Sequence, residues 1–564
     1  MAQKNMNLNI AQYSLEKFLS LNYLTEYSHE FVINNIYLDL FKKELVDDID
    51  LYELCIESNK QYETRIIDEF GELLNGIDVN EKKEIVYRIL TGNFFNYKKL
   101  DNTNYSLSEL ILRLLKIESG DMLFDLGSGL GGFLASSIDF AEKNNILYKE
   151  LLGMDVNGEL INLSKVALSI IKSEKTILNL FVGDALDKSA YAYNKAYVFP
   201  PFGLKLMNFD KKIPSKMFEH MFSQRSNIEW LFVDSMLKGL VGNQRAVAIC
   251  TMKSLYNDAD KEYRNQLIKS GLLEGIIEFP SGMFEYMGIK ICMLIFSKNN
   301  TNVKFVDATK CFDKLSNRFK GSDLPIEKIY NEYFNGNFML KNIEEVLDAN
   351  NLTPSHWMTK NKVVLYENGM KLSDCAKVFT GSQYTVKNFE NMFTNVKTGY
   401  KILTSSDINE GMVQWDLLPN IDYKDTKFDK YAIKKNDVIV TSKSSKVKTV
   451  VVDIEPKEKI LVTGGMLIVR PEIDKLDPTF LKIYLDSPEG VNVLKMIQKG
   501  SYIVTINGKD LANIVIPSIT IDKQRKMAQK YNNKLTTLIA YKKEIEQLEN
   551  SLNHFFINEM EENL

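Results

Sequence analysis

Hydrophobic positions divide the first half of the chain into two stretches with different periodicities. Up to residue 105, apolar side chains recur at intervals of three and four, as at Leu15, Phe18 and Leu19, which predicts helices. Farther on, short apolar runs alternate with helical stretches. Such alternation predicts parallel βαβ units and an α/β sheet covered on both faces. The seven expected strands are 122–126, 151–155, 177–182, 195–199, 245–251, 274–279 and 290–297, and the short link before the last predicts that the final two are antiparallel.

The pattern of apolar and polar residues changes twice in the second half of the chain. Residues 301–365 mix both patterns and predict a connector, whereas 366–520 hold short strands broken by Gly, Asn and Asp, which predicts an α+β domain. Apolar residues in 521–564 then alternate steps of three and four, which predicts a long coiled-coil-like helix. The predicted order is a helical domain (1–105), an α/β domain (106–300), the connector, the α+β domain and the helix.

Composition and charge narrow the function classes. The chain has 564 residues, 26% of them charged, and a net charge of −4, which argues against a protein coated in nucleic acid along its whole length. No apolar run approaches the ~20 residues of a membrane span, and the N-terminus lacks a signal-peptide core, so we expect a cytoplasmic protein with no membrane contact. Five scattered cysteines and four distant histidines predict reduced thiols and no metal site.

A glycine-rich loop follows the first expected strand of the sheet. Asp125, Gly127, Gly129 and Gly131 lie between an apolar run and a helical stretch, where glycines let backbone N–H groups approach a ligand. The loop also satisfies the pattern Gly-x-Gly-x-x-Gly through Gly127, Gly129 and Gly132, and this pattern is compatible with NAD binding. Asp125 favours S-adenosylmethionine, because a carboxylate at that place attracts an amino group and repels a pyrophosphate.

Two further acids end the next two strands. Asp155 is placed to accept hydrogen bonds from ribose hydroxyls, a role that serves NAD equally well. Asp184 can accept from an adenine amino group, but an ordinary turn aspartate explains Gly183-Asp184 nearly as well. Of the three acids, only Asp125 therefore discriminates between the two cofactors.

A rigid turn, Val198-Phe199-Pro200-Pro201-Phe202-Gly203, ends the fourth strand. Two prolines fix the backbone and leave carbonyl groups directed outward, and the following aromatic ring offers a stacking surface for a base extruded from DNA. Taken in isolation, the same residues could merely terminate a strand. Their position after a cofactor loop favours a methyl-transfer site that acts on DNA.

Positive charge is concentrated in residues 424–448. Lysine-rich stretches are most often solvated surface, but 441–449 mix lysines with hydroxyls, the usual partners of DNA phosphates. Both interpretations stay open. The candidate DNA-binding residues are Lys443, Ser444, Lys446 and Lys448.

With these motifs in order, the chain resembles the modification subunit of type I restriction–modification systems, an N6-adenine DNA methyltransferase family. The similarity covers 125–134, Asp155, 183–186 and 199–202, and continues through 263–267, 272–280, 282–284, 288–298 and 350–357. The resemblance implies a Rossmann-like, seven-stranded domain that uses S-adenosylmethionine. Asp125, Gly127, Gly129, Gly131, Asp155 and Asp184 are then the cofactor residues.

The C-terminal third resembles the target-recognition domain of the specificity subunit from the same systems. The matching segments are 371–381, 406–411, 436–439, 478–485 and 511–524. This resemblance implies a fusion of catalytic and recognition parts that binds double-stranded DNA beside a restriction or other defence subunit. One recognition domain reads one half-site, so the resemblance also suggests a homodimer through the C-terminal helix.

One position departs from the pattern of that family. Phe199 stands where the family has an asparagine whose side chain, with the next proline carbonyl, accepts from the adenine amino group. A phenyl ring accepts no such bond, so one of two acceptors is missing from Phe199, Pro200, Pro201 and Phe202. The sequence predicts an adenine-N6 methyltransferase and leaves open a catalytically weak or inactive protein that recognises DNA.

Overall fold

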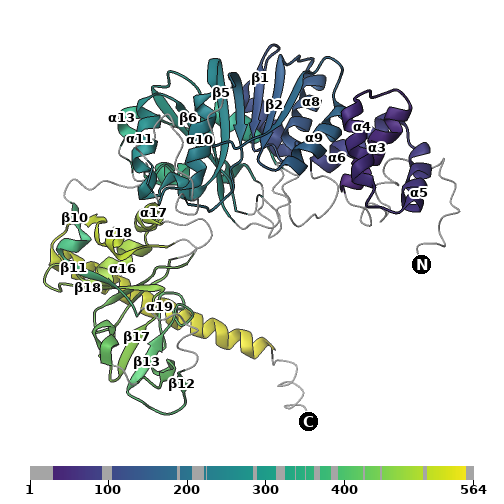
Figure 1. The fold of residues 1–564 in the computed structure, drawn as a ribbon. Helices are drawn as coiled ribbons and strands as arrows, with labels where there is room; N and C mark the ends of the chain where they lie inside the picture. Colours follow the sequence, from purple (N-terminus) through teal and green to yellow (C-terminus); the bar gives the residue numbers. More distant parts are fainter. Residues whose placement is uncertain are drawn as a thin grey trace, which may run out of the picture. The chain divides into compact units, whose positions relative to one another are not determined.

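A computed structural model describes the chain in two compact units, Met1–Trp357 and Met358–Leu564 (Figure 1). Each unit is treated by itself below. The described residues are 29–91, 105–186, 191–205, 222–223, 225–281, 283, 289–312, 324–336, 338–347, 349, 351–360, 369–382, 392–423, 426–444, 447–498 and 505–553.

The first unit is built on a sheet with the strand order β3-β2-β1-β4-β5-β7-β6-β8-β9. The seven predicted strands all form and are followed by two more. The predicted antiparallel pair is confirmed, because β7 lies antiparallel to both β5 and β6. The strands are β1 (Met122–Leu126), β2 (Glu150–Asp155), β3 (Leu178–Val182), β4 (Tyr193–Val198), β5 (Leu240–Thr251), β6 (Leu273–Glu278), β7 (Ile291–Phe296), β8 (Asn302–Asp307) and β9 (Met339–Asn342).

The count of seven strands was too low because the segment predicted as a connector contributes β8 and β9 to the sheet. β8 pairs in parallel with β6, and Val303 and Phe305 are fully buried. Lys304 interrupts the apolar run of β8, and β9 has only 4 residues. Neither strand therefore shows the long apolar run by which the other strands were predicted. The same stretch also holds helices α12 (Ile326–Phe334), α13 (Ile343–Val346) and α14 (Pro354–Lys360).

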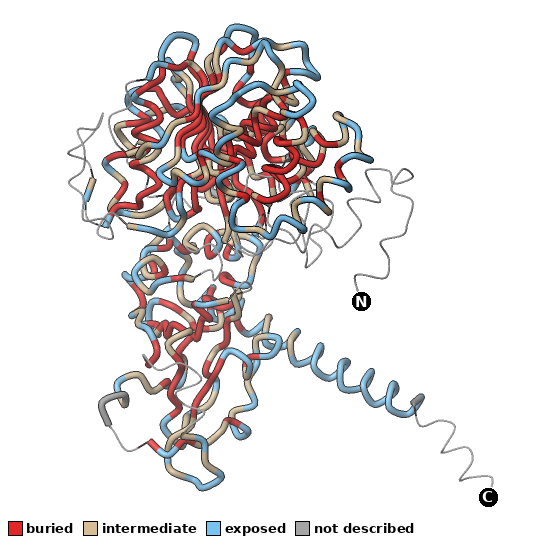
Figure 2. The backbone as a smooth tube through the Cα atoms, turned by 45° about the vertical axis from the view of Figure 1, so that its right-hand side comes forward, coloured by how far each residue is buried: buried red, intermediate tan, exposed pale blue. Residues whose placement is uncertain are grey.

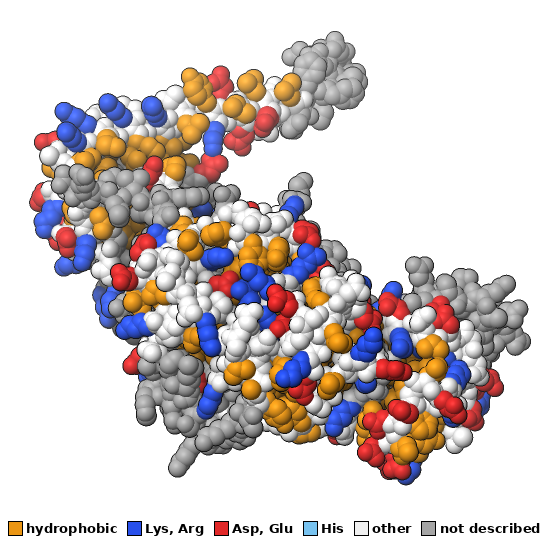
Figure 3. Space-filling model, turned by 90° about the horizontal axis from the view of Figure 1, so that it is seen from above, with side chains coloured by type: hydrophobic (Ala, Val, Ile, Leu, Met, Phe, Trp, Pro, Cys, Tyr) orange, Lys and Arg blue, Asp and Glu red, His pale blue; other side chains and the backbone are white. Residues whose placement is uncertain are grey.

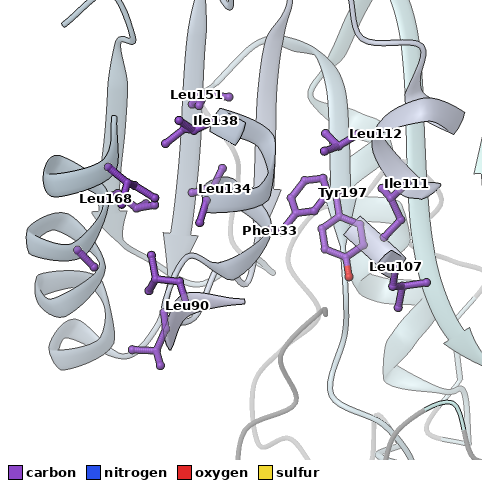
Figure 4. Close-up of a cluster of buried hydrophobic side chains, with 14 of the residues drawn as sticks. Leu90, Leu107, Ile111, Leu112, Phe133, Leu134, Ile138, Leu151, Leu168 and Tyr197 are labelled. Atoms are coloured by element: carbon purple, nitrogen blue, oxygen red, sulfur yellow. The ribbon is translucent and has the colours of Figure 1, made fainter. Parts of the chain in front are cut away.

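Helices cover both faces of the sheet, as the alternating pattern predicted. On one face lie α7 (Tyr105–Leu115), α8 (Gly132–Asn144), α9 (Gly158–Ile171) and α12, whose apolar sides share one buried cluster with the sheet. Figure 4 shows part of it, with Phe133 beside Tyr197 and Ile111 and Leu112 nearby. On the other face, α10 (Ile228–Lys238) and α11 (Lys261–Lys269) pack with α13 and Trp357. Figure 2 shows the strands of this sheet as mostly buried.

The N-terminal helices extend the first of these clusters. They are α3 (His29–Lys42), α4 (Ile49–Asn59), α5 (Thr64–Asn75) and α6 (Val79–Leu90), and α3 and α6 pack against α9. Ile33 and Ile36, at the predicted spacing, are fully buried in α3. Asp78 and Glu81 form a capping box at the start of α6, satisfying donors that the first turn leaves free. The predicted positions Leu15, Phe18 and Leu19 lie outside the described residues.

The second unit combines three small sheets with helices within its described residues. Its sheets are β10-β19, β11-β18-β15-β16 and β12-β14-β13-β17. The strands are β10 (Gly369–Lys371), β11 (Ala376–Thr380), β12 (Phe393–Thr394), β13 (Tyr400–Leu403), β14 (Asn420–Ile421), β15 (Val438–Thr441), β16 (Thr449–Val451), β17 (Lys459–Val462), β18 (Met466–Pro471) and β19 (Val515–Pro517); the helices beside them are α16 (Pro478–Asp486), α17 (Pro488–Ile497) and α18 (Gly508–Ala512).

The long C-terminal helix is present as α19 (Ile521–Asn553). Its first turns pack on α16, where Gln524 is fully buried and donates to the carbonyl of Ile519 over 2.9 Å. The later turns are exposed, as the pale blue tube in Figure 2 shows. Among the helices of the described residues, none is both long and apolar enough to cross a membrane.

Candidate functional site

The predicted site residues gather because four neighbouring strands end at one edge of the sheet. β1, β2, β3 and β4 are parallel, and Leu126 at the end of β1 is aligned with Met154 of β2 and Val198 of β4. The glycine loop, the two acids after β2 and β3, and the Pro-Pro turn therefore leave the sheet side by side. This carboxyl edge is where ligands bind in open α/β sheets.

The glycine loop is held by its own backbone and by β2. The N–H groups of Gly127 and Ser128 both donate to the carbonyl of Met154 over 2.8 Å. Gly131, the residue just before α8, lies in the left-handed region at a φ of 86°, and a Cβ atom there would lie 2.5 Å from Oγ of Ser164. Only glycine meets both demands without strain. Gly131 therefore lets the loop pack closely against α9, which carries Ser164.

Asp155 fixes the loop as well as ending β2. Its Oδ2 accepts from the Gly129 N–H over 3.0 Å, and its Oδ1 accepts from the Asn157 N–H over 2.9 Å. Each carboxylate oxygen can accept a second hydrogen bond, so the residue can still bind hydroxyl groups. The sequence had suggested a ligand-binding role for Asp155 but had not revealed this structural one.

Asp125 is a buried acid with a raised pKa at the carboxyl edge of the sheet. Its side chain is 3% exposed, and within the described part of the chain no group donates a hydrogen bond to its carboxylate. Burial, together with the negative charge of Asp155, raises the pKa of Asp125 to about 8. A buried acid in this condition is stabilised by a cation, which is what the ammonium and sulfonium groups of S-adenosylmethionine supply.

Asp184 forms the turn that follows β3. Its Oδ1 accepts from the Leu186 N–H over 2.9 Å, which is the turn-aspartate arrangement considered from the sequence. Apolar side chains near these acids are exposed, with Val156 at 67% and Val182 at 58%. Exposed valines beside hydrogen-bonding acids suit a flat, partly apolar group such as an adenine ring.

The Pro-Pro turn presents two aromatic rings. The ring centroids of Phe199 and Phe202 lie 5.0 Å apart at an angle of 56°, and both rings pack partly on the apolar cluster of the α7–α8 face. Pro200 is buried and Pro201 is exposed. The structure therefore brings Phe199, Pro200, Pro201 and Phe202 to the same edge as the glycine loop.

A further acid, Glu229, supports this turn and was missed in the sequence. It lies in the first turn of α10, is 1% exposed, and accepts from the Thr251 N–H over 3.0 Å and from the Ser254 hydroxyl. Burial raises the pKa of Glu229, and hydrogen bonds from Ser254, Thr251 and the Gly203 N–H oppose that rise. An acid inside the apolar run Ile228–Leu231 was the signal available.

The candidate DNA-binding lysines in the second unit differ from one another. Lys443 is exposed, whereas Nζ of Lys448 donates to the carbonyls of Ser405 and Ile408 over 2.9 and 2.8 Å. Lys448 therefore stabilises its own domain. Ser444 is half-buried, and Lys446 lies outside the described residues. On the face shown in Figure 3, positive and negative side chains are interspersed.

Comparison with known proteins agrees with the geometry of the first unit. Residues 87–362 match the family model described as N-6 DNA Methylase. The chain is 24% identical over 353 residues to the type I restriction enzyme MpnII methylase subunit of Mycoplasma pneumoniae, covering 57% of this chain and 61% of that protein. The resemblance to type I modification subunits is thus confirmed.

A second relative is of the specificity type. The chain is 30% identical over 162 residues to the type I restriction enzyme EcoBI specificity subunit of Escherichia coli, covering 28% of this chain and 32% of that protein. Among solved structures, the type I restriction-modification methyltransferase subunit from Streptococcus thermophilus has a TM-score of 0.43 and 22% identity over 54% of this chain and 69% of that one. The chain thus spans less than two thirds of the length of either curated relative.

Proposed function

We propose that this chain is a sequence-specific DNA methyltransferase that transfers a methyl group from S-adenosylmethionine to N6 of an adenine extruded from the duplex. The observation that carries the proposal is the pairing of β1, which ends in the glycine loop, with β4, which ends in the Pro-Pro turn. A methyl donor on the loop and a base on the turn would meet at one edge of the sheet. The N-6 DNA methylase match over 87–362 supports the same reaction.

The cofactor side of the edge fits S-adenosylmethionine, which supplies an electrophilic methyl group when bound. Asp125 offers a buried carboxylate to its amino group, and Asp155 keeps lone pairs for ribose hydroxyls. Gly127, Gly129 and Gly131 let backbone N–H groups approach, and Asp184 lies near the exposed valines that suit the adenine ring. A pyrophosphate beside Asp125 would meet repulsion, which disfavours NAD.

The base side would hold an adenine between the turn and the loop. The carbonyl of Pro200 can accept from the exocyclic amino group, and the ring of Phe202 can stack on the base. Phe199 contributes a second ring and no acceptor. A missing transition-state hydrogen bond costs on the order of 2.7–4 kcal/mol, or ~100- to 1000-fold in rate, so turnover is expected to be slow.

Label transfer tests the proposal directly. Purified full-length protein is incubated with S-adenosylmethionine tritiated in its methyl group and an unmethylated plasmid library with randomised inserts. Incorporation into DNA, localised to N6-methyladenine by nucleoside analysis and to one motif by long-read sequencing, is the expected result. Calorimetry in the same buffer checks cofactor binding by itself. Absence of both binding and incorporation would overturn the proposal.

Phe199 also favours a second candidate function. In this alternative the chain is a methyltransferase relic that binds DNA without modifying it, since two aromatic rings on a rigid turn can stack on a base without an acceptor. In that case the wild type binds S-adenosylmethionine and DNA but transfers no label. The asparagine variant described below separates the two candidates.

The second unit is proposed to read the DNA sequence as a target-recognition domain. The match to a specificity subunit supports this fusion. Lys443, Ser444 and Lys446 are the proposed phosphate contacts, while Lys448 would act by holding its segment in place. Lys443→Ala should weaken binding to every sequence alike and reduce its salt dependence, as measured by fluorescence anisotropy at several salt concentrations.

We further propose that α19 joins two copies of the chain. Along its exposed turns, Leu538, Tyr541, Ile545, Leu548 and Leu552 repeat at steps of three and four and are each at least half exposed. Pairing these faces would bury them and bring two half-site readers together, beside a restriction or other defence subunit. Replacement of both Ile545 and Leu548 by Glu should give a monomer in sedimentation velocity, and a wild-type monomer with and without DNA would contradict the pairing.

A further inference from the structure

The Pro-Pro turn cannot hold its own shape by backbone hydrogen bonds alone. Pro200 and Pro201 have no N–H group, so after Phe199 the next backbone donors belong to Phe202 and Gly203. On the incoming side, Val198 is held in the sheet between Leu126 of β1 and Ala248 of β5. The outgoing side lies beyond the sheet and needs a separate anchor.

The start of α10 supplies that anchor. The carbonyl of Leu204 accepts from the N–H of Ile228 over 3.1 Å, and Lys205 forms an isolated antiparallel bridge with Asn227. The backbone N–H of Gly203 lies near the carboxylate of Glu229 and favours its ionised form. Leu204 and Lys205 of the turn are therefore tied to Ile228 and Asn227 at the beginning of one helix, next to Glu229.

The carboxylate of Glu229 is itself fixed by hydrogen bonds from Thr251 and Ser254. Thr251, at the end of β5, donates to it through its N–H over 3.0 Å and through its hydroxyl over 3.0 and 3.1 Å, and Ser254 donates through its hydroxyl. The carbonyl of Ser254 in turn accepts from Nε1 of Trp230 and Nη1 of Arg264, each over 3.1 Å. A buried acid with this many fixed donors has one orientation, because any other leaves donors unpaired.

We propose that Glu229 is a positioning residue that sets the Pro-Pro turn relative to the glycine loop, by fixing the start of α10 to which Leu204 and Lys205 are bound. The inference rests on the proposed function, since what it positions is the site for the base. Within the described residues Glu229 makes no hydrogen bond to the loop or to the acids that would hold the cofactor, so its loss should change the chemical step and leave cofactor affinity alone. Displacements of about 1 Å in such a support can cost ~100-fold in rate.

The variant Glu229→Gln tests the role with two measurements on full-length protein. An amide must turn its NH₂ group toward at least one of the surrounding donors, which loosens the hold of Thr251 and Ser254 on the start of α10 and so on the end of the turn. Hydrogen–deuterium exchange should then become at least tenfold faster in the segment 202–205 and stay unchanged in 125–135. The affinity for S-adenosylmethionine, by calorimetry, should stay within twofold, while the single-turnover rate of label transfer to the plasmid library falls at least tenfold.

Glu274→Gln is the matched control, because Glu274 is also a buried acid but binds Arg245 and Tyr333 at the start of β6, far along the strands from the turn. It should lower thermal stability without faster exchange in 202–205. Unchanged exchange in that segment for Glu229→Gln, or equal loosening of 125–135, would overturn the inference. A wild type that transfers no label would count against the proposed function and leave the exchange result to decide the role of Glu229.

Discussion

The glycine loop and the Pro-Pro turn leave neighbouring strands, yet they depend on the sequence in different ways. The loop is shaped by backbone hydrogen bonds to Met154 and Asp155 and by glycine conformations, so several residues maintain it together. In the proposed reaction, the chemistry of the turn would depend on single groups, the side chain at position 199 and the carbonyl of Pro200. The proposal therefore implies that one substitution can remove most of the rate while the loop keeps its shape.

The substitution Phe199→Asn should have the largest effect. An asparagine carbonyl restores a second acceptor for the adenine amino group, so we expect label transfer to rise ~100- to 1000-fold. Phe199→Ala is the control, since it removes the ring without adding an acceptor and should give no increase. Single-turnover assays of both variants measure the difference. Wild-type turnover equal to that of the asparagine variant would mean that the turn works without this acceptor.

Asp125→Asn tests the other region. Hydrogen bonds to a charged group are worth ~1.5–3 kcal/mol, so the dissociation constant for S-adenosylmethionine should rise roughly 10- to 150-fold. Asp121→Asn is a suitable comparison, because Asp121 is also buried but binds Asn194 at the opposite end of β1. Titration calorimetry of both variants decides the outcome. Equal affinities for Asp125→Asn and the wild type would remove the cofactor role of Asp125.

Features that depend on local sequence could be predicted, whereas features that depend on contacts between distant residues could not. The strands of the sheet, the loop and the turn could be predicted because apolar runs, glycines and prolines act locally. The surroundings of Glu229 could not, since Thr251 and Ser254, which donate to its carboxylate, come together with it only in the fold. The same holds for Lys448, whose charge suggested DNA and whose ammonium group binds two carbonyls of its own domain.

Gly131→Ala tests how strongly the shape of the glycine loop depends on a glycine at this position, without changing any charge. A Cβ atom would lie 2.5 Å from Oγ of Ser164 at a φ of 86°, which combines crowding with a left-handed backbone. The two effects together should lower stability by about 2–4 kcal/mol. Gly120→Ala is the control, because its φ is 92° and the space around it is open, so only the backbone strain applies. Chemical denaturation of the two variants should differ accordingly, and equal losses would show that Ser164 gives way.

The smallest predicted effect, taken over one pH unit, is the dependence of cofactor affinity on pH. Burial and the charge of Asp155 raise the pKa of Asp125 to about 8, so at pH 7 most of the free protein carries a neutral carboxyl group there. Binding of an ammonium group requires the ionised form, and the affinity should therefore fall by up to about tenfold for each pH unit below 8.

Above pH 8 the trend should reverse, because the α-amino group of the ligand itself loses its proton near pH 7.7–8.0. A maximum near pH 8 follows, with proton release on binding at pH 7, which calorimetry detects as a dependence on the ionisation enthalpy of the buffer. Asp125→Asn has no carboxyl group to ionise, so its acid limb should be flat. If wild type and variant share one pH profile, the pH dependence comes from the ligand alone. Asp155 would then be the acid by which the cofactor side of the edge differs from the uncharged Pro-Pro turn.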